Sequence, residues 1–188
     1  MVLWLWAAVA GALAAEPVRP TTQPAQHLPA QHLPATHLAI ARAVAGDGLP
    51  LCRQHLPDGT EAPCLPSFAV KPGGAINARS RGGQITFTRG ATTRLTADEF
   101  ALLAGHEIAH WYLGHTESNP ANEYAADRLG AVLACRAGYD VARGASLFRF
   151  IGRSRAHPAP RTRREAVEQL GGCALDQGKP AMLQISGE

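Results

Sequence analysis

The chain has 188 residues, of which 46% are hydrophobic and 18% are charged. These values are typical of one compact domain with a short leader, and they allow a buried core. The net charge of +3 does not favour a nucleic-acid-binding protein.

Residues 1–15 are expected to form an export signal. The run from Val2 to Ala15 is apolar and too short to span a bilayer comfortably, and Ala12-Leu13-Ala14 supplies a small-x-small cleavage pattern. No Lys or Arg precedes this run, which leaves an uncleaved anchor open. We expect export to the periplasm or cell envelope, with no integral membrane span in the mature chain.

Residues 16–35 are rich in proline and contain a direct repeat, in which residues 26–30 read QHLPA and residues 31–35 read QHLPA again. Proline at this density blocks helix formation and favours an extended chain. We therefore interpret this segment as a linker. One folded domain is expected over residues 36–175, and a tail over residues 176–188.

The four cysteines suggest two disulfides, as expected for an exported protein. Cys52 and Cys64 flank a short loop and form the natural local pair, which leaves Cys135 to pair with Cys173. Four reduced thiols are the alternative. A cysteine-based zinc site is not indicated, because no C-x-x-C spacing occurs.

The first part of the domain combines one helix with short strands. The pattern is helical from residue 36 to about Gly46, and alternation then predicts strands at three places, which are residues 67–70, 75–78 and 84–88. Gly82-Gly83 supports a turn between the last two strands.

The second part is predicted to be helical. Thr96 and Glu99 form a capping box that begins a helix ending near Gly114. Asn119-Pro120 opens a second helix that runs to about Gly138. Two further helices are expected near residues 141–151 and 161–170.

The first of these helices carries His106-Glu107-Ile108-Ala109-His110. Histidines four apart lie on one helix face, so both imidazoles can reach one metal ion, and Glu107 can act as a base beside a water at that metal. Glu123 begins the second helix and is the candidate third ligand. Three protein ligands plus water is the arrangement of catalytic zinc.

Two neighbouring residues refine this interpretation. Asp127 lies one turn beyond Glu123 and is expected to accept a hydrogen bond from the free ring nitrogen of a ligand histidine. The metzincin variant is excluded, because Leu113 and Thr116 stand where its glycine and third histidine belong. His115 is one position off that register; it could face the cleft, but an exposed turn position is the favoured interpretation.

The chain resembles peptidase family M48 over roughly residues 66–170. The shared motifs are Ile76-Asn77-Ala78 with Gly82-Gly83, the HExxH segment, Glu123-Tyr124-Ala125-Ala126-Asp127, and His157-Pro158 followed by Arg163 or Arg164. The resemblance implies an α+β, gluzincin-type fold, mostly helical with a small β-sheet beside the HExxH helix.

The resemblance also implies roles for individual residues. His106, His110 and Glu123 would hold one zinc ion per chain, with Glu107 as base and Asp127 behind the ligands. His157 would be a candidate oxyanion stabiliser, and Arg163 would be a positioning residue that is also grouped with the substrate-binding residues. Asn77, beside the sheet edge, is a candidate for binding the substrate backbone as an added strand.

We therefore predict a zinc-dependent endopeptidase that hydrolyses proteins of the cell envelope, with a possible role in quality control. The connection between the HExxH helix and Glu123 is short, and no second hydrophobic span is present. The alternative is a metal-binding, chaperone-like quality-control module with little proteolytic activity. The natural substrate and the oligomeric state stay open.

Overall fold

The structure is a computed structural model that describes residues 31–46, 53–55, 61–63, 65–152 and 157–170. The expected export signal, most of the linker and three of the four cysteines lie outside these ranges, so the signal and the disulfide pairing stay predictions. Within the described ranges, no helix has the length and apolar character needed to cross a membrane.

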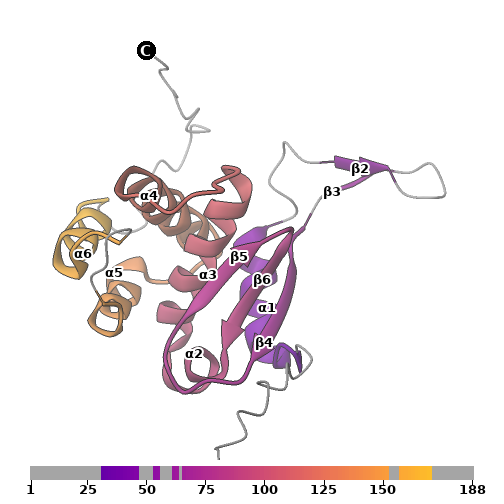
Figure 1. Cartoon of the computed structure of the whole chain (residues 1–188), viewed down its shortest axis with the longest axis horizontal. Coiled ribbons are helices and arrows are strands. Elements are labelled where there is room, and N and C mark those ends of the chain that lie inside the picture. Colours follow the sequence, from indigo (N-terminus) through magenta and orange to yellow (C-terminus); the bar gives the residue numbers. More distant parts are fainter. Residues whose placement is uncertain (1–30, 47–52, 56–60, 64, 153–156, 171–188) are drawn as a thin grey trace, which may run out of the picture.

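A four-stranded mixed sheet forms one side of the molecule (Figure 1). Its strands are β1 (Gln31–His32), β4 (Ser67–Lys71), β5 (Ala78–Arg81) and β6 (Gln84–Thr88), in the spatial order β1-β4-β6-β5. Strands β4 and β6 are parallel, and the other pairs are antiparallel. A separate hairpin pairs β2 (Arg53–His55) with β3 (Glu61–Pro63).

The predicted turn at Gly82-Gly83 joins β5 to β6. Both glycines have positive φ angles, 56° and 78°, which a two-residue hairpin turn of this kind requires. The preceding strand begins at Ala78, whereas the sequence predicted a strand over residues 75–78. The reason is Thr88, whose hydroxyl donates to the Ala75 carbonyl at 2.6 Å and accepts from the Asn77 amide at 3.1 Å, holding this segment as a loop.

The folded domain begins before residue 36. Gln31 and His32 pair with β4, and Leu33 is buried, although the sequence placed all three in the linker. This pairing uses the edge of the sheet opposite β5. The chain therefore enters the domain on the side of the sheet that is far from β5.

Six α-helices and one 3₁₀ helix are present in the described part of the chain. The helices are α1 (Ala35–Ala45), α2 (Arg89–Arg94), α3 (Ala97–Tyr112), α4 (Pro120–Arg136), α5 (Val141–Gly144), η1 (Ala145–Phe150, 3₁₀) and α6 (Pro160–Glu168). The helix predicted near residues 141–151 is thus α5 followed by η1. The short helix α2 was not predicted.

Helices α1 and α3 cover the inner face of the sheet (Figure 1). Ile85 and Phe87 of β6 and Phe100 of α3 are fully buried, and the Phe87 and Phe100 rings lie 4.8 Å apart. The alternation of β6 therefore decides which side of the sheet carries the core. The fold is α+β, mostly helical with a small mixed sheet, as predicted.

The ends of α3 and α4 are fixed by the caps that the sequence indicates. Thr96 accepts from the Glu99 amide, and the Glu99 carboxylate accepts from the Thr96 amide at 2.9 Å, which completes the capping box. Gly114 follows α3 with a φ of 66°. The Asn119 side chain then accepts from the Asn122 amide at 3.0 Å and starts α4.

Candidate metal centre

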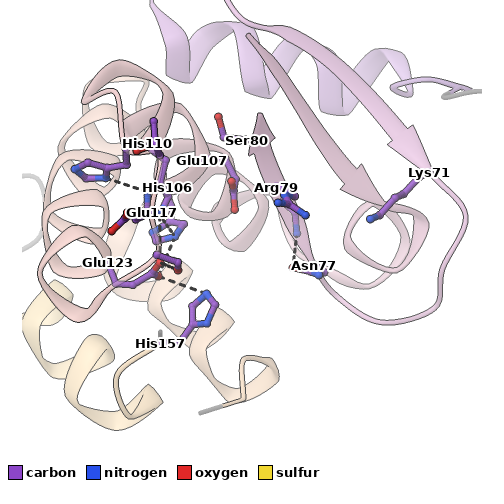
Figure 2. A pocket seen from close by; sticks show the side chains of 14 residues that line it. Lys71, Asn77, Arg79, Ser80, His106, Glu107, His110, Glu117, Glu123 and His157 are labelled. Atoms are coloured by element: carbon purple, nitrogen blue, oxygen red, sulfur yellow. Dashed lines mark hydrogen bonds and ion pairs between the residues drawn. The ribbon is translucent and has the colours of Figure 1, made fainter. Parts of the chain in front are cut away.

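His106, His110 and Glu123 direct their side chains toward one point between α3 and α4 (Figure 2). The Nε2 atoms of the two histidines lie 3.0 Å apart, and each lies 3.5 Å from one carboxylate oxygen of Glu123. Ligand atoms around a tetrahedral zinc ion at ordinary bond lengths are about 3.3 Å apart. The observed separations therefore fit one such ion without rearrangement.

The Glu123 carboxylate gives a second indication of a cation-binding site. The side chain is buried, and its Oε2 atom has no hydrogen-bond partner. Nitrogens of Arg163, His106 and His157 surround this atom, but at 3.4 to 3.6 Å. Because an unsatisfied buried carboxylate oxygen is costly, this atom is suited to metal coordination. Two imidazole nitrogens and a carboxylate oxygen form a donor set that fits zinc.

The inner side of the centre is built by Asp127 and Arg163. Asp127 Oδ1 lies 3.0 Å from His106 Nδ1, which matches the predicted hydrogen bond. Arg163 donates to both oxygens of Asp127 at 2.7 Å, and both side chains are 2% exposed. This bidentate ion pair fixes Asp127, which in turn fixes the ring of His106.

The same contacts change the acidity of the buried groups. Burial lowers the pKa of His106, but the Asp127 and Glu123 carboxylates outweigh burial and raise it to about 9. Burial raises the pKa of Glu123, yet the histidines and the Arg163 charge hold it far below its usual value. Both carboxylates, Glu123 and Asp127, are therefore ionised in the folded protein and favour positive charge at this point.

The sequence analysis gave Arg163 two roles, as a positioning residue and as a substrate-binding residue, and its surroundings favour the first. The side chain is buried behind Asp127, with its guanidinium 5.1 Å from the centre of the Phe148 ring. It does not line the cleft. Arg163 is a positioning residue, because its charge is used inside the protein to neutralise Asp127.

The outer side of the centre is built by the loop between α3 and α4. The Ser118 hydroxyl donates to Glu123 Oε1 at 2.9 Å. His115, which was expected to be an exposed turn residue, lies with its Nδ1 atom 3.0 Å from Nδ1 of His110. The loop therefore contacts two of the three candidate ligands.

A cleft opens in front of the three side chains (Figure 2). One wall carries His106, Glu107 and His110, and Glu107 is 8% exposed. The opposite wall is formed by the sheet and includes Asn77, Ala78, Arg79 and Ser80 of the β5 region, and Lys71 at the end of β4. Glu107 is therefore placed between the candidate metal position and the open edge of the sheet.

Asn77 and His157 both line this cleft. The Asn77 side chain accepts a hydrogen bond from the Ala78 amide at 2.9 Å, so its oxygen covers the first backbone donor of the β5 edge. His157 approaches from the segment before α6, with Nε2 3.6 Å from Glu123 Oε2. Their positions agree with the sequence analysis, and their roles stay predictions.

Two glycines that the sequence analysis did not identify allow α3 and α4 to approach each other. A Cβ atom at Gly105 would lie 2.4 Å from the Gly130 carbonyl oxygen, and one at Gly130 would lie 2.5 Å from the His106 amide nitrogen. Only glycine fits at these positions without moving a helix. The sequence signal was a glycine inside each of two helical patterns, which often marks close packing.

The comparisons agree with this geometry. A comparison with curated proteins gives no match to the chain. Residues 59–121 match the model of peptidase family M48, a segment that includes β5, β6 and the whole of α3 and ends just before Glu123. Over this segment, which is 63 of the chain's 188 residues, the chain is similar to peptidase family M48.

Proposed function

We propose that this chain is a zinc-dependent endopeptidase that hydrolyses peptide bonds of proteins. The observation that carries the proposal is the buried Glu123 carboxylate. Its Oε2 atom has no hydrogen-bond partner, and each of its two oxygens lies 3.5 Å from the Nε2 atom of a different histidine that lines the open cleft. A purely structural cluster would have satisfied this oxygen within the protein.

His106, His110 and Glu123 would hold the zinc ion through two Nε2 atoms and one carboxylate. When bound, zinc supplies a Lewis acid that lowers the pKa of a water molecule and polarises the substrate carbonyl. The Asp127–Arg163 pair keeps the His106 ring in the orientation that directs Nε2 to the ligand position.

Glu107 is the general base in this proposal. Its side chain lines the cleft next to both histidines, where it accepts a proton from the attacking water and then passes it to the leaving amine. His157 lines the same cleft opposite Glu107 and would donate a hydrogen bond to the carbonyl oxygen as negative charge develops there.

The open edge of β5 would hold the substrate as an additional strand. The Thr88 amide donates to the Asn77 carbonyl at 2.9 Å, so Asn77 directs its backbone carbonyl toward β6. Because backbone directions alternate, Ser80 directs its amide and carbonyl toward the open edge and Ala78 directs its carbonyl there, while the Ala78 amide is bonded to the Asn77 side chain. A peptide paired there would lie along α3 and present its backbone to Glu107.

The proposed location is the cell envelope, with quality control of envelope proteins as the biological role. This part rests on the apolar segment from Val2 to Ala15 and its small-x-small pattern. Its test is fractionation of cells that express the full chain. Recovery of the full-length chain in the cytoplasm, with the apolar segment retained, would contradict this location.

The test of the chemistry is Glu107→Gln in the full chain. We expect proteolysis of casein or of a quenched fluorescent peptide to fall by about 100-fold or more, while the metal content stays unchanged. Glu117→Gln is the matched control, because Glu117 is exposed in the same cleft and has no part in the mechanism. Full activity of Glu107→Gln with metal still bound would contradict the mechanism, whereas a wild-type chain that binds metal and cleaves neither substrate would support the alternative of a binding module.

Metal analysis of the purified chain tests the cofactor independently of activity. We expect about one zinc per chain, since a three-ligand site should retain its metal during purification. A content below about half an equivalent, not restored by added zinc, would contradict the proposal.

A further inference from the structure

His115 makes two hydrogen-bond contacts with His110. Both residues line the cleft that is drawn in Figure 2. Its Nδ1 atom lies 3.0 Å from His110 Nδ1, and its backbone amide donates to the His110 carbonyl at 3.0 Å. Gly114, with a φ of 66°, turns the chain between them. The sequence predicted that α3 ends here and favoured an exposed position for His115, whereas the turn returns its imidazole to the helix.

The role of this contact follows from the tautomer of His110. A histidine that binds metal through Nε2 carries its remaining proton on Nδ1. His110 Nε2 faces His106 Nε2 and Glu123, so Nδ1 is the donor atom. In the described part of the chain, the polar contact of His110 Nδ1 is with His115. His115 must therefore accept this hydrogen bond and carry its own proton on Nε2.

We propose that His115 is a positioning residue that fixes the tautomer and ring orientation of the metal ligand His110. This inference rests on the metal site of the proposed function. The two ligand histidines are then supported differently: His106 by the Asp127 carboxylate, and His110 by a neutral imidazole. His115 is not a further ligand itself, because its contact is with Nδ1 of His110, the ring nitrogen opposite the one that faces the other ligands.

The experiment measures zinc affinity of the full chain with a competing chelator. For His115→Ala we expect zinc binding about 10- to 100-fold weaker, the usual cost of removing a group that orients a ligand. His115→Asn should recover a large part of this loss, because an amide oxygen can accept the same hydrogen bond. Thr116→Ala, in the adjacent exposed position, is the control and should bind zinc like the wild type.

Two outcomes would overturn the inference. One is zinc affinity of His115→Ala within about twofold of the wild type, since an orienting group is worth much more. The other is equal loss in His115→Ala and His115→Asn, with normal circular dichroism, because the acceptor would then be irrelevant. A wild-type chain that binds no zinc defeats the proposed function as well. An active Glu107→Gln variant defeats only the peptidase mechanism and leaves the affinity result valid.

A second inference concerns the sheet wall of the cleft. Lys71 and Arg79 line it, and Arg81 follows on β5; all three side chains are exposed. Neither a side-chain hydrogen bond nor an ion pair within the described ranges involves any of them. The residues of this wall include no carboxylate, and the exposed Glu117 belongs to the loop instead.

The register places the three cations on one face of the sheet. On β6, the partners of Arg79, Arg81 and Lys71 are Thr86, Gln84 and Thr88. These partners alternate with Ile85 and Phe87, whose side chains are buried. The three cations therefore lie on the face of the sheet away from Ile85 and Phe87. A substrate strand added to β5 would place every second side chain directly across from Arg79 or Arg81. An alternative role for these charges is to protect the sheet edge from aggregation. Such charges would be needed only on the edge strand β5, whereas Lys71 lies on the inner strand β4.

We infer that the substrates are acidic polypeptide segments, with Asp or Glu at two positions separated by one residue. This inference rests on the proposed function, because it assumes that the β5 edge holds the substrate. Each opposite-charge pair across adjacent strands should raise kcat/KM by about twofold to fivefold over the neutral peptide.

The test compares peptides that differ only by Asp against Asn at the two alternating positions. The wild type should prefer the acidic peptide, and Arg79→Gln with Arg81→Gln should remove the preference. Arg79→Glu with Arg81→Glu should instead prefer a peptide with lysines there. Arg89→Gln, an exposed arginine of α2 outside this cleft, is the control. A preference that survives in the double variant would overturn the inference, whereas lack of cleavage of either peptide by wild-type enzyme would contradict the proposed function.

Discussion

Glu99 and Glu123 occupy equivalent places in consecutive helices, yet their environments differ. Each lies in the first turn of its helix, and each side chain is buried. Glu99 accepts hydrogen bonds from the Thr96 amide and the Ser146 hydroxyl, and pairs with Arg149 at 2.9 Å. Glu123 accepts from Ser118, but its second oxygen has no hydrogen-bond partner.

The difference separates a structural carboxylate from a candidate ligand. Both oxygens of Glu99 are used by protein groups, so its role is complete as a helix cap that also binds η1. Glu123 keeps one buried oxygen available next to two histidine nitrogens. Burial alone therefore does not identify a functional carboxylate; an unsatisfied atom next to other ligand atoms does.

The largest loss of stability is expected at Arg163, the buried cation that neighbours Glu123. Arg163→Met leaves the Asp127 carboxylate buried without its ion-pair partner, and we expect a loss of about 3–5 kcal/mol in the free energy of unfolding. Urea denaturation measures this. Arg164→Met is the control, because its ion pair with Glu168 is exposed and should contribute less than about 1 kcal/mol. Equal stability of the two variants would contradict the structural role of Arg163.

Glu123→Gln should affect metal binding more than folding. The amide keeps the shape but loses the charge and the ligand strength of the carboxylate, so we expect zinc affinity to fall by more than about 100-fold. Competition with a chelator measures the change. The Glu99→Gln variant is the comparison, and its zinc affinity should equal that of the wild type. A similar loss of zinc in both variants would remove the distinction between the two carboxylates.

Glu99→Gln should show the opposite pattern, with lower stability and normal zinc content. The variant keeps the size of the side chain but weakens the capping box and the contact with Arg149, and leaves polar groups imperfectly paired. We expect a cost of about 1–3 kcal/mol in the free energy of unfolding, measured in urea. Glu165→Gln, an exposed residue paired with Arg161, should change stability by less than about 0.5 kcal/mol.

The smallest effect is the pH dependence of stability that Glu99 contributes. Burial raises its pKa, but hydrogen bonds from Ser146 and Thr96 and the charge of Arg149 hold the pKa below the ordinary value of 4.5. A carboxylate with a lowered pKa stabilises the fold above its unfolded pKa, and this contribution is lost as the pH falls through the folded pKa. Stability should therefore fall more steeply below pH 4.5 in the wild type than in Glu99→Gln. Parallel urea midpoints between about pH 5 and pH 3 would contradict this assignment.

Local signals in the sequence were sufficient for much of the fold. The capping box at Thr96, the helix start at Asn119-Pro120 and the turn at Gly82-Gly83 all involve residues within four positions of one another. The predicted strand over residues 75–78 was misplaced because Thr88, ten or more residues away, holds that segment as a loop. Secondary-structure propensity is a local property of the residues, so it does not account for such long-range hydrogen bonds.

The candidate site divides in the same way. Helical spacing placed His106 and His110 on one face, and the short connection to the next helix brought Glu123 and Asp127 beside them, as expected. The sequence left Arg163 open as a positioning or a substrate-binding residue, because a motif position does not report burial. Arg163 is buried because α6 packs against α4, and this contact is a property of the tertiary structure.

The sequence by itself determined the chemistry available to this protein: two histidines one helical turn apart with a glutamate between them, a second helix with an acidic residue in its first turn, and the caps that fix where both helices start. The tertiary structure decided which of these groups remain unsatisfied. It did so through the contact of Gly105 with Gly130, which lets α3 and α4 approach, and through the turn at Gly114, which returns His115 to His110. The physical reason is that hydrogen-bond satisfaction depends on all neighbours in space, and most of these neighbours are distant in the chain.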